Sequence, residues 1–224
     1  MGGSGSFPID LVLFGMIAAF LVLRLRSILG RKTGFERPAQ PETPAAGVPG
    51  LGRPATVVPL RPAPAAPARA LPDPGSPTGQ VLARMHEVNR AFDPAHFLAG
   101  AEAAFRMIVT AFAAGDRVAL RPLLSDDTYR AFEGAIAARE AAGDTQRSEV
   151  RGIQMAAIEA AGLSGSLATI TVRLVSDQVA ETLDRAGRSV QGTDAVTELT
   201  DLWTFERDLS QPDPAWRLSA AHSG

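Results

Sequence analysis

Twelve of the seventeen prolines lie between residues 38 and 80, and this cluster is the feature that most restricts the fold. Proline fixes φ and has no backbone N–H, so such a stretch favours extended polyproline conformations and cannot pack a core. The cluster therefore divides the chain. We predict a membrane anchor helix with a short N-terminal tail at residues 1–30, a basic collar and a disordered Pro/Ala-rich linker at 31–80, and one folded domain at 81–224.

The predicted anchor is the apolar run "LVLFGMIAAFLVL", followed by Arg24, Arg26, Arg31 and Lys32. A cleaved signal peptide carries its positive charge before the apolar run, so this order predicts an anchor that is retained. The run is apolar on all sides, which suits lipid better than one face of a core. Because basic flanks stay in the cytoplasm, we expect a single transmembrane helix with the folded domain on the cytoplasmic side. A helix lying in the membrane interface is the alternative.

Charge and composition limit the partners and the chemistry of the chain. Residues 1–37 carry five basic and two acidic side chains, a net charge of +3, whereas residues 81–224 carry 14 Arg against 20 Asp and Glu, a net charge of −6. The four basic residues after the apolar run are candidate contacts for anionic lipid headgroups. The acidic domain argues against nucleic acid as a partner. The chain has no Cys, and we find neither metal-ligand spacing nor a phosphate-binding loop, so we expect no cofactor and no metal.

Within the predicted domain, helical periodicity comes first and strand periodicity follows. Asp93 and Pro94 begin a helix that ends at Gly115, and Ser125 begins another that ends at Gly143, with a short helix between them. Alternation then predicts strands at 148–163, 166–184, 196–209 and 215–221, with a polar turn at 185–195. Helices followed by antiparallel strands predict an α+β domain in which the helices pack on one face of the sheet.

Two apolar groups are candidates for lining a pocket. Phe97, Phe105, Ile108 and Phe112 recur at helical spacing, and they either pack an ordinary core or line a lipid or acyl pocket. The strand at 196–209 and the last strand add further candidates, which either fill the concave side of the sheet or wall a pocket: Leu199, Asp201, Trp203, Phe205 and Trp216.

Asp201 stands out because alternation places it between Leu199 and Trp203 on an apolar face. A buried carboxylate could act as a general base, but such sites also need an oxyanion donor, and the only tyrosine is Tyr129 on a predicted helix. A bulge or edge position that exposes Asp201, or a salt bridge to an arginine, is the alternative. No nucleophile constellation accompanies it, so we expect no enzyme.

The combination of anchor, linker, helices and strands resembles the bacterial relatives of Tim44, the mitochondrial inner-membrane translocase component. The opening "FLVLRLRSILGRKTG" is similar to that of alphaproteobacterial members, and the ending "DLWTFERDL…DPAWRL" is the more specific motif. The resemblance covers the anchor and residues 81–224. It implies a Tim44-like domain, similar in fold to nuclear transport factor 2 (NTF2) and ketosteroid isomerase, with helices packed on a curved antiparallel sheet around an apolar pocket.

The resemblance also implies a function. Mitochondrial Tim44 is a peripheral membrane adaptor that contacts cardiolipin-rich membrane and links the channel to the Hsp70 motor. The Hsp70-recruiting region has no visible counterpart here, so we carry over the adaptor role and leave out the Hsp70 partnership. We expect a non-enzymatic adaptor for protein transport at the cytoplasmic face of the bacterial inner membrane, bound to inner-membrane or envelope proteins and to anionic lipid. A pocketed carrier of a small molecule or lipid, or a ketosteroid isomerase-like enzyme, is the alternative.

Overall fold

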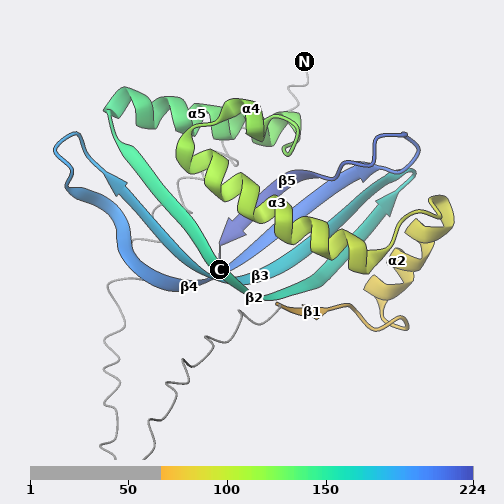
Figure 1. Ribbon diagram of the computed structural model, residues 1–224. Coiled ribbons are helices and arrows are strands. Elements are labelled where there is room, and N and C mark those ends of the chain that lie inside the picture. Colours follow the sequence, from red (N-terminus) through yellow and green to blue (C-terminus); the bar gives the residue numbers. More distant parts are fainter. Residues whose placement is uncertain (1–66, 224) are drawn as a thin grey trace, which may run out of the picture.

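The computed structural model describes residues 67–223, which form helices and a single five-stranded sheet (Figure 1). In chain order the elements are β1 (Ala68–Ala70), α2 (Pro77–Val88), α3 (Pro94–Ala114), α4 (Arg117–Leu120), α5 (Asp126–Ala142), β2 (Thr145–Ser164), β3 (Leu167–Leu183), β4 (Ser189–Asp208) and β5 (Arg217–Ser223). The prediction of an α+β domain is confirmed, and within residues 81–224 the helices precede the strands, although β1 comes before them all.

Helix α3 is the longest helix, and it begins and ends where the sequence predicts. The Asp93 carboxylate accepts a hydrogen bond from the His96 backbone N–H at 2.6 Å and so satisfies one of the free donors of the first turn. Gly115 ends the helix with a φ of 70°, in the left-handed region that glycine adopts without strain. The buried residues of α3 recur at helical spacing, so one face of the helix points into the core.

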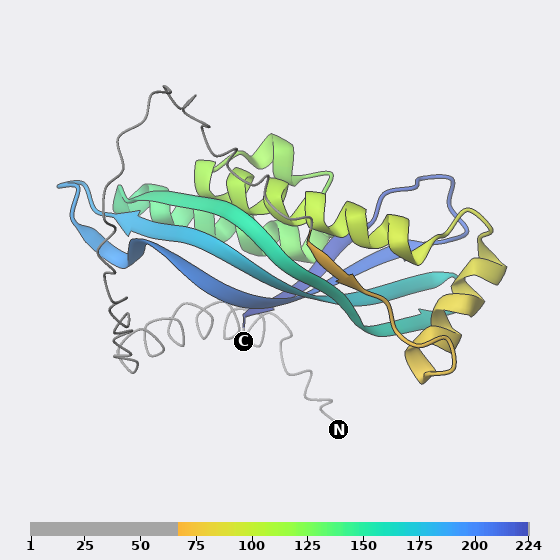
Figure 2. The same cartoon turned by 60° about the horizontal axis from the view of Figure 1, so that its bottom comes forward.

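The sheet curves around α3, and its strands lie in the order β1-β2-β3-β4-β5 (Figures 1 and 2). Every neighbouring pair is antiparallel except β1 with β2. Helices α3, α4 and α5 lie on the concave face, and in Figure 2, where the bottom of Figure 1 comes forward, they lie beyond the strands. The alternation predicted for the clearest strand is confirmed: Ala168, Ile170, Val172 and Leu174 are all fully buried.

The ordered structure begins before residue 81, inside the region that we assigned to the linker. Strand β1 pairs with Met155–Ala157 of β2, and Arg69 donates two hydrogen bonds to the largely buried Glu102 carboxylate, at 2.7 and 3.0 Å. Helix α2 then starts at Pro77, with the Ser76 side chain as its N-cap. Composition hid both elements, because the proline-rich character of the linker continues through Pro72, Pro74 and Pro77.

The turn predicted at 185–195 is wrong in its extent. The turn itself is short, and it is held by Asp184 Oδ1, which accepts hydrogen bonds from the backbone N–H groups of Ala186 and Arg188. From Ser189 onward the chain pairs with β3. Gly192 has a φ of 77°, and any Cβ at this position would collide with the Ala180 carbonyl oxygen. Gly192 pairs with Glu181 between two register shifts of β3 and β4, so a glycine within a strand made that part of the strand look like a turn.

The anchor predicted at 1–30, most of the linker at 31–80, and the candidate lipid contacts Arg24, Arg26, Arg31 and Lys32 lie outside the described residues. Among the residues that the structure describes, α3 alone is long and apolar enough to cross a membrane. Length and composition are weak signs by themselves, and Leu98, Phe105 and Ile108 of α3 are buried in the core. We therefore assign α3 to the domain core.

Candidate functional site

One half of the concave face is filled by an unbroken series of aromatic rings. Trp216 lies just before β5, not within the last strand as predicted, and contacts Phe92 and Phe97 with ring centroids 5.9 and 4.7 Å away. The ring centroid of Phe97 lies 6.0 Å from that of Phe205, and the centroid of Phe205 lies 6.3 Å from that of Trp203. Phe97 and Phe205 are buried, so at these residues the core interpretation holds. We call this region the filled half.

The other half of the concave face contains a cavity of about 380 Å³. Trp203 forms the boundary, because its ring packs edge-on against Phe105 at 4.6 Å and also lines the cavity. Helix α3 adds Ile108 and Phe112, and α5 adds Phe132, whose ring lies 4.9 Å from that of Phe112. Six of the nine predicted pocket residues line this cavity: Phe105, Ile108, Phe112, Leu199, Asp201 and Trp203. We call this region the open half.

Asp201 is in the wall of the open half, and only 5% of it is exposed. The alternative in which a bulge or an edge position exposes Asp201 is therefore wrong, because β4 keeps its alternation through Asp201, Trp203 and Phe205. The side-chain amide N–H of Gln178 on β3 donates to Asp201 Oδ2 at 3.1 Å and to Ser176 Oγ at 2.9 Å. All three polar side chains are buried, so the apolar cavity has one polar end.

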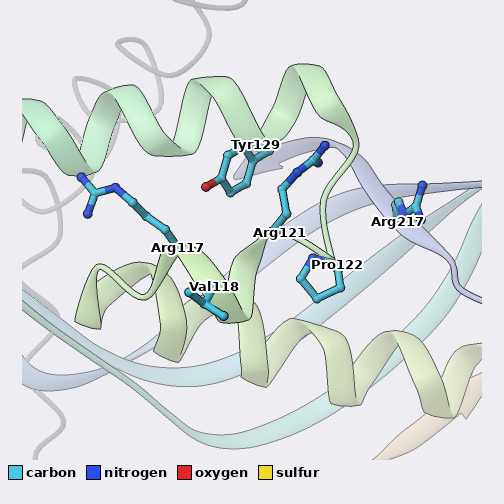
Figure 3. A pocket seen from close by; sticks show the side chains of 6 residues that line it. All are labelled: Arg117, Val118, Arg121, Pro122, Tyr129 and Arg217. Atoms are coloured by element: carbon cyan, nitrogen blue, oxygen red, sulfur yellow. The ribbon is translucent and has the colours of Figure 1, made fainter.

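Tyr129 lies away from Asp201. Its ring lines a separate pocket between α4, α5 and the start of β5, together with Arg117, Arg121 and Arg217 (Figure 3). The Arg121 guanidinium is 4.9 Å from the centre of the Tyr129 ring. The tyrosine that would serve as oxyanion donor in a ketosteroid isomerase-like site is thus not among the residues that line the Asp201 cavity.

The arginines of this second pocket already have acidic partners. Arg117 donates two hydrogen bonds to Glu140, at 2.9 and 2.8 Å, and these hold the pKa of the Glu140 carboxyl below its ordinary value. A hydrogen bond from Arg121 lowers the pKa of Asp126 in the same way. Arg217 pairs with Asp213 at 3.1 Å. The pocket therefore does not present a concentrated positive charge to an anion.

On the other side of α4 lies an open apolar groove between α3 and α4. Its lining residues are mostly small or apolar: Met107, Thr110, Ala111, Ala114, Ala119, Pro122 and Leu123, with Arg106 and Asp116. Met107 in this groove is 51% exposed, whereas Val118 of α4, which is 85% exposed, lines the Tyr129 pocket. Apolar side chains that gather at a groove while exposed to water are typical of a surface that binds another protein.

The sequence contained signals for some of the residues that we missed. Phe132 falls one turn after Thr128 on the buried side of α5, so its periodicity pointed to the cavity. Gln178 gave no such signal, because its contact with Asp201 depends on the pairing of β3 with β4, which places Asp201 opposite Leu174 and within reach of Gln178 further along β3. Among residues 67–223, no group of three His, Asp or Glu side chains could hold a metal ion.

Comparison with known proteins gives a family match. The model of the Tim44-like domain matches residues 78–223, while no curated protein matches the chain. Similar solved structures include the following three. The intermembrane space region of the chloroplast protein ARC6 aligns over 59% of this chain and 97% of its own length, with 12% identity and a TM-score of 0.43. A conserved protein of Planctomyces limnophilus DSM 3776 aligns over 58% of this chain and 95% of its own length, with 18% identity and a TM-score of 0.35. An NTF2-like family protein of Streptomyces avermitilis, proposed to be a dehydratase, aligns over 58% of this chain and 97% of its own length, with 14% identity and a TM-score of 0.33.

Proposed function

Because the chain belongs to the Tim44-like domain family, we propose that it is a membrane-anchored, non-enzymatic adaptor whose Tim44-like domain binds a protein partner at the cytoplasmic face of the bacterial inner membrane. Family membership supports a membrane-associated scaffold or binding role. In the proposed arrangement the N-terminal apolar run holds the chain at the membrane. The Pro-rich linker raises the concentration of the domain near membrane-bound partners without fixing its orientation.

The observation that carries the adaptor proposal is the exposed apolar groove between α3 and α4. The proposed occupant is an apolar segment of an inner-membrane or envelope protein, because Met107 is 51% exposed in a groove of mostly small or apolar residues, a surface that such a segment would bury. Arg106 and Asp116 flank the groove and can hydrogen-bond at its rim. Burial of this surface favours binding, and the mixed charges at the rim favour a defined orientation.

A photo-crosslinking residue placed at position 107 of the full-length chain, within the groove, tests this proposal in cells. The matched control is position 190, because Val190 is 51% exposed on β4, away from the groove. We expect one protein of the envelope to crosslink at position 107 and not at 190. This crosslink should be lost when Ala119 in the wall of the groove is replaced by Asp. Equal crosslinking at both positions would contradict a specific groove.

Membrane attachment is tested by cell fractionation after deletion of residues 1–30. We expect the full-length protein in the membrane fraction and the deletion variant in the cytosol. Persistence of the deletion variant on the membrane would mean that the folded domain itself binds lipid and that the anchor is dispensable.

Charge reversal of Arg24, Arg26, Arg31 and Lys32 then tests the proposed contacts with anionic headgroups, since it should weaken binding to anionic but not to neutral vesicles.

A second candidate function is that of a carrier for a small amphiphile, and the cavity of the open half favours it. Its walls are apolar, Asp201 lies at one end, and Trp203 borders the space without filling it. Binding, as opposed to catalysis, is the better use of this site, because Asp201 interacts with Gln178 and Tyr129 lines a different pocket.

A further inference from the structure

The cavity of the open half has a distinct chemical polarity, and this restricts what it can bind. Most of its wall is apolar, from α3, α5, β4 and β5. At about 30 Å³ for each carbon, similar to a water molecule in the liquid, its 380 Å³ hold a chain of about a dozen carbon atoms. Such a ligand would bury its chain against Phe112, Phe132 and Trp203 and gain the free energy of removing apolar surface from water.

The polar end of the cavity offers hydrogen-bond acceptors. The Gln178 amide nitrogen has two hydrogens, and one goes to Asp201 while the other goes to Ser176. What Gln178 can still offer a ligand is therefore its carbonyl oxygen. Asp201 beside it adds a carboxylate, which as an ion only accepts hydrogen bonds.

The remaining polar groups of the wall do not change the preference of the cavity for a head group that donates hydrogen bonds. The Thr128 hydroxyl donates to the Ser219 carbonyl oxygen at 3.0 Å. The Gln146 amide nitrogen donates to Ser148, and its oxygen accepts from Arg139. Asp201 and the exposed His222 are the titratable groups of the lining, which contains no Lys or Arg. The head group of an anionic ligand would thus meet a carboxylate in a poorly hydrated site, with no lysine or arginine in the wall to pair with it.

From this arrangement we infer that the open half binds a single-chain amphiphile whose head group donates hydrogen bonds, an alcohol or a protonated amine, and rejects a fatty acid of the same length. The inference rests on the carrier proposal and adds the class of ligand. Its head group would lie against Asp201 and Gln178, and its chain would extend between α3 and α5 toward Phe112 and Phe132.

The two tryptophans provide the test, because one belongs to each half. The full-length protein in phosphatidylcholine nanodiscs is titrated with 11-bromoundecanol, 11-bromoundecylamine and 11-bromoundecanoate, whose bromine quenches nearby tryptophan. Trp216→Phe leaves Trp203 at the boundary of the cavity as the reporter, and Trp203→Phe leaves Trp216 in the filled half. Since both variants share the same bilayer, general partition of the probes into lipid affects them alike.

We expect the alcohol and the amine to quench Trp203 at least about tenfold more tightly than the carboxylate, and none of the probes to quench Trp216 selectively. Asp201→Asn should reduce this preference of the amine over the carboxylate, and Ala135→Leu, which fills the cavity away from Asp201, should abolish quenching by all three. Equal or tighter binding of the carboxylate would overturn the ligand class and leave the carrier proposal intact. Absence of selective Trp203 quenching by any probe would overturn both.

Discussion

The two halves of the concave face share α3 and β4 but differ in how they are packed. In the filled half, Phe97 from α3 meets Phe205 from β4, and Trp216 closes the space. In the open half, the next turns of α3 and the preceding residues of β4 diverge around a cavity of about 380 Å³. The difference lies in the side chains opposite α3: large rings in one half, and Leu199, Asp201 and alanines in the other. One half therefore supplies stability, and the other is available for binding.

The largest effect should come from truncating a ring in the filled half. Phe205→Ala removes a fully buried side chain that contacts Phe97 and Trp203, so it should lower the free energy of unfolding by about 3–5 kcal/mol. Phe112→Ala is the matched change in the open half. Because the Phe112 ring is partly exposed and lines the cavity, this change should lower the free energy of unfolding by only about 1–2 kcal/mol. Urea denaturation measures both, and equal losses would erase the distinction between the halves.

Added volume should have opposite consequences in the two halves. Ala101→Leu inserts three carbons beside Phe97 and Phe105 in packed surroundings and should destabilise the domain by about 1–3 kcal/mol. Ala135→Leu places the same carbons in the cavity and should leave stability unchanged or raise it by up to about 1 kcal/mol. Thermal denaturation of the two variants gives the comparison. A large loss from Ala135→Leu would mean that the open half is already full.

The smallest effect concerns the outer surface of α4 and α5, away from both halves. Arg117 lowers the pKa of Glu140, so the pair contributes stability above the ordinary pKa of 4.5 and loses it as pH falls through the lower pKa of the folded state. Both side chains are exposed, so the loss on acidification should be slight. Arg117→Gln should remove this part of the pH dependence below pH 4.5 while leaving denaturation at neutral pH nearly unchanged.

The sequence was informative wherever local periodicity decides the structure. It predicted the capping of α3 by Asp93 and Gly115, the buried face of β3, and the alternation that places Asp201 between Leu199 and Trp203. It was uninformative where long-range contacts decide. Strand β1 exists because three residues pair with β2 and Arg69 reaches Glu102, 33 residues along the chain.

The candidate site shows the same limit. Periodicity identified Phe105, Ile108 and Phe112 as one face of a helix, but it could not tell a filled space from an open one. That outcome depends on the volume of the side chains opposite them on the sheet. Gln178 reaches Asp201 because the register of β3 against β4 places Asp201 opposite Leu174, and no local pattern predicts the register between two strands.

The most direct test of the difference between the halves is a crystal structure of the protein under xenon pressure, since xenon enters empty apolar cavities and is excluded from packed ones. We predict xenon density in the open half, among Phe112, Phe132 and Trp203, and none among Phe97, Phe205 and Trp216. Side chains that close the open half and leave no xenon site there would contradict the account.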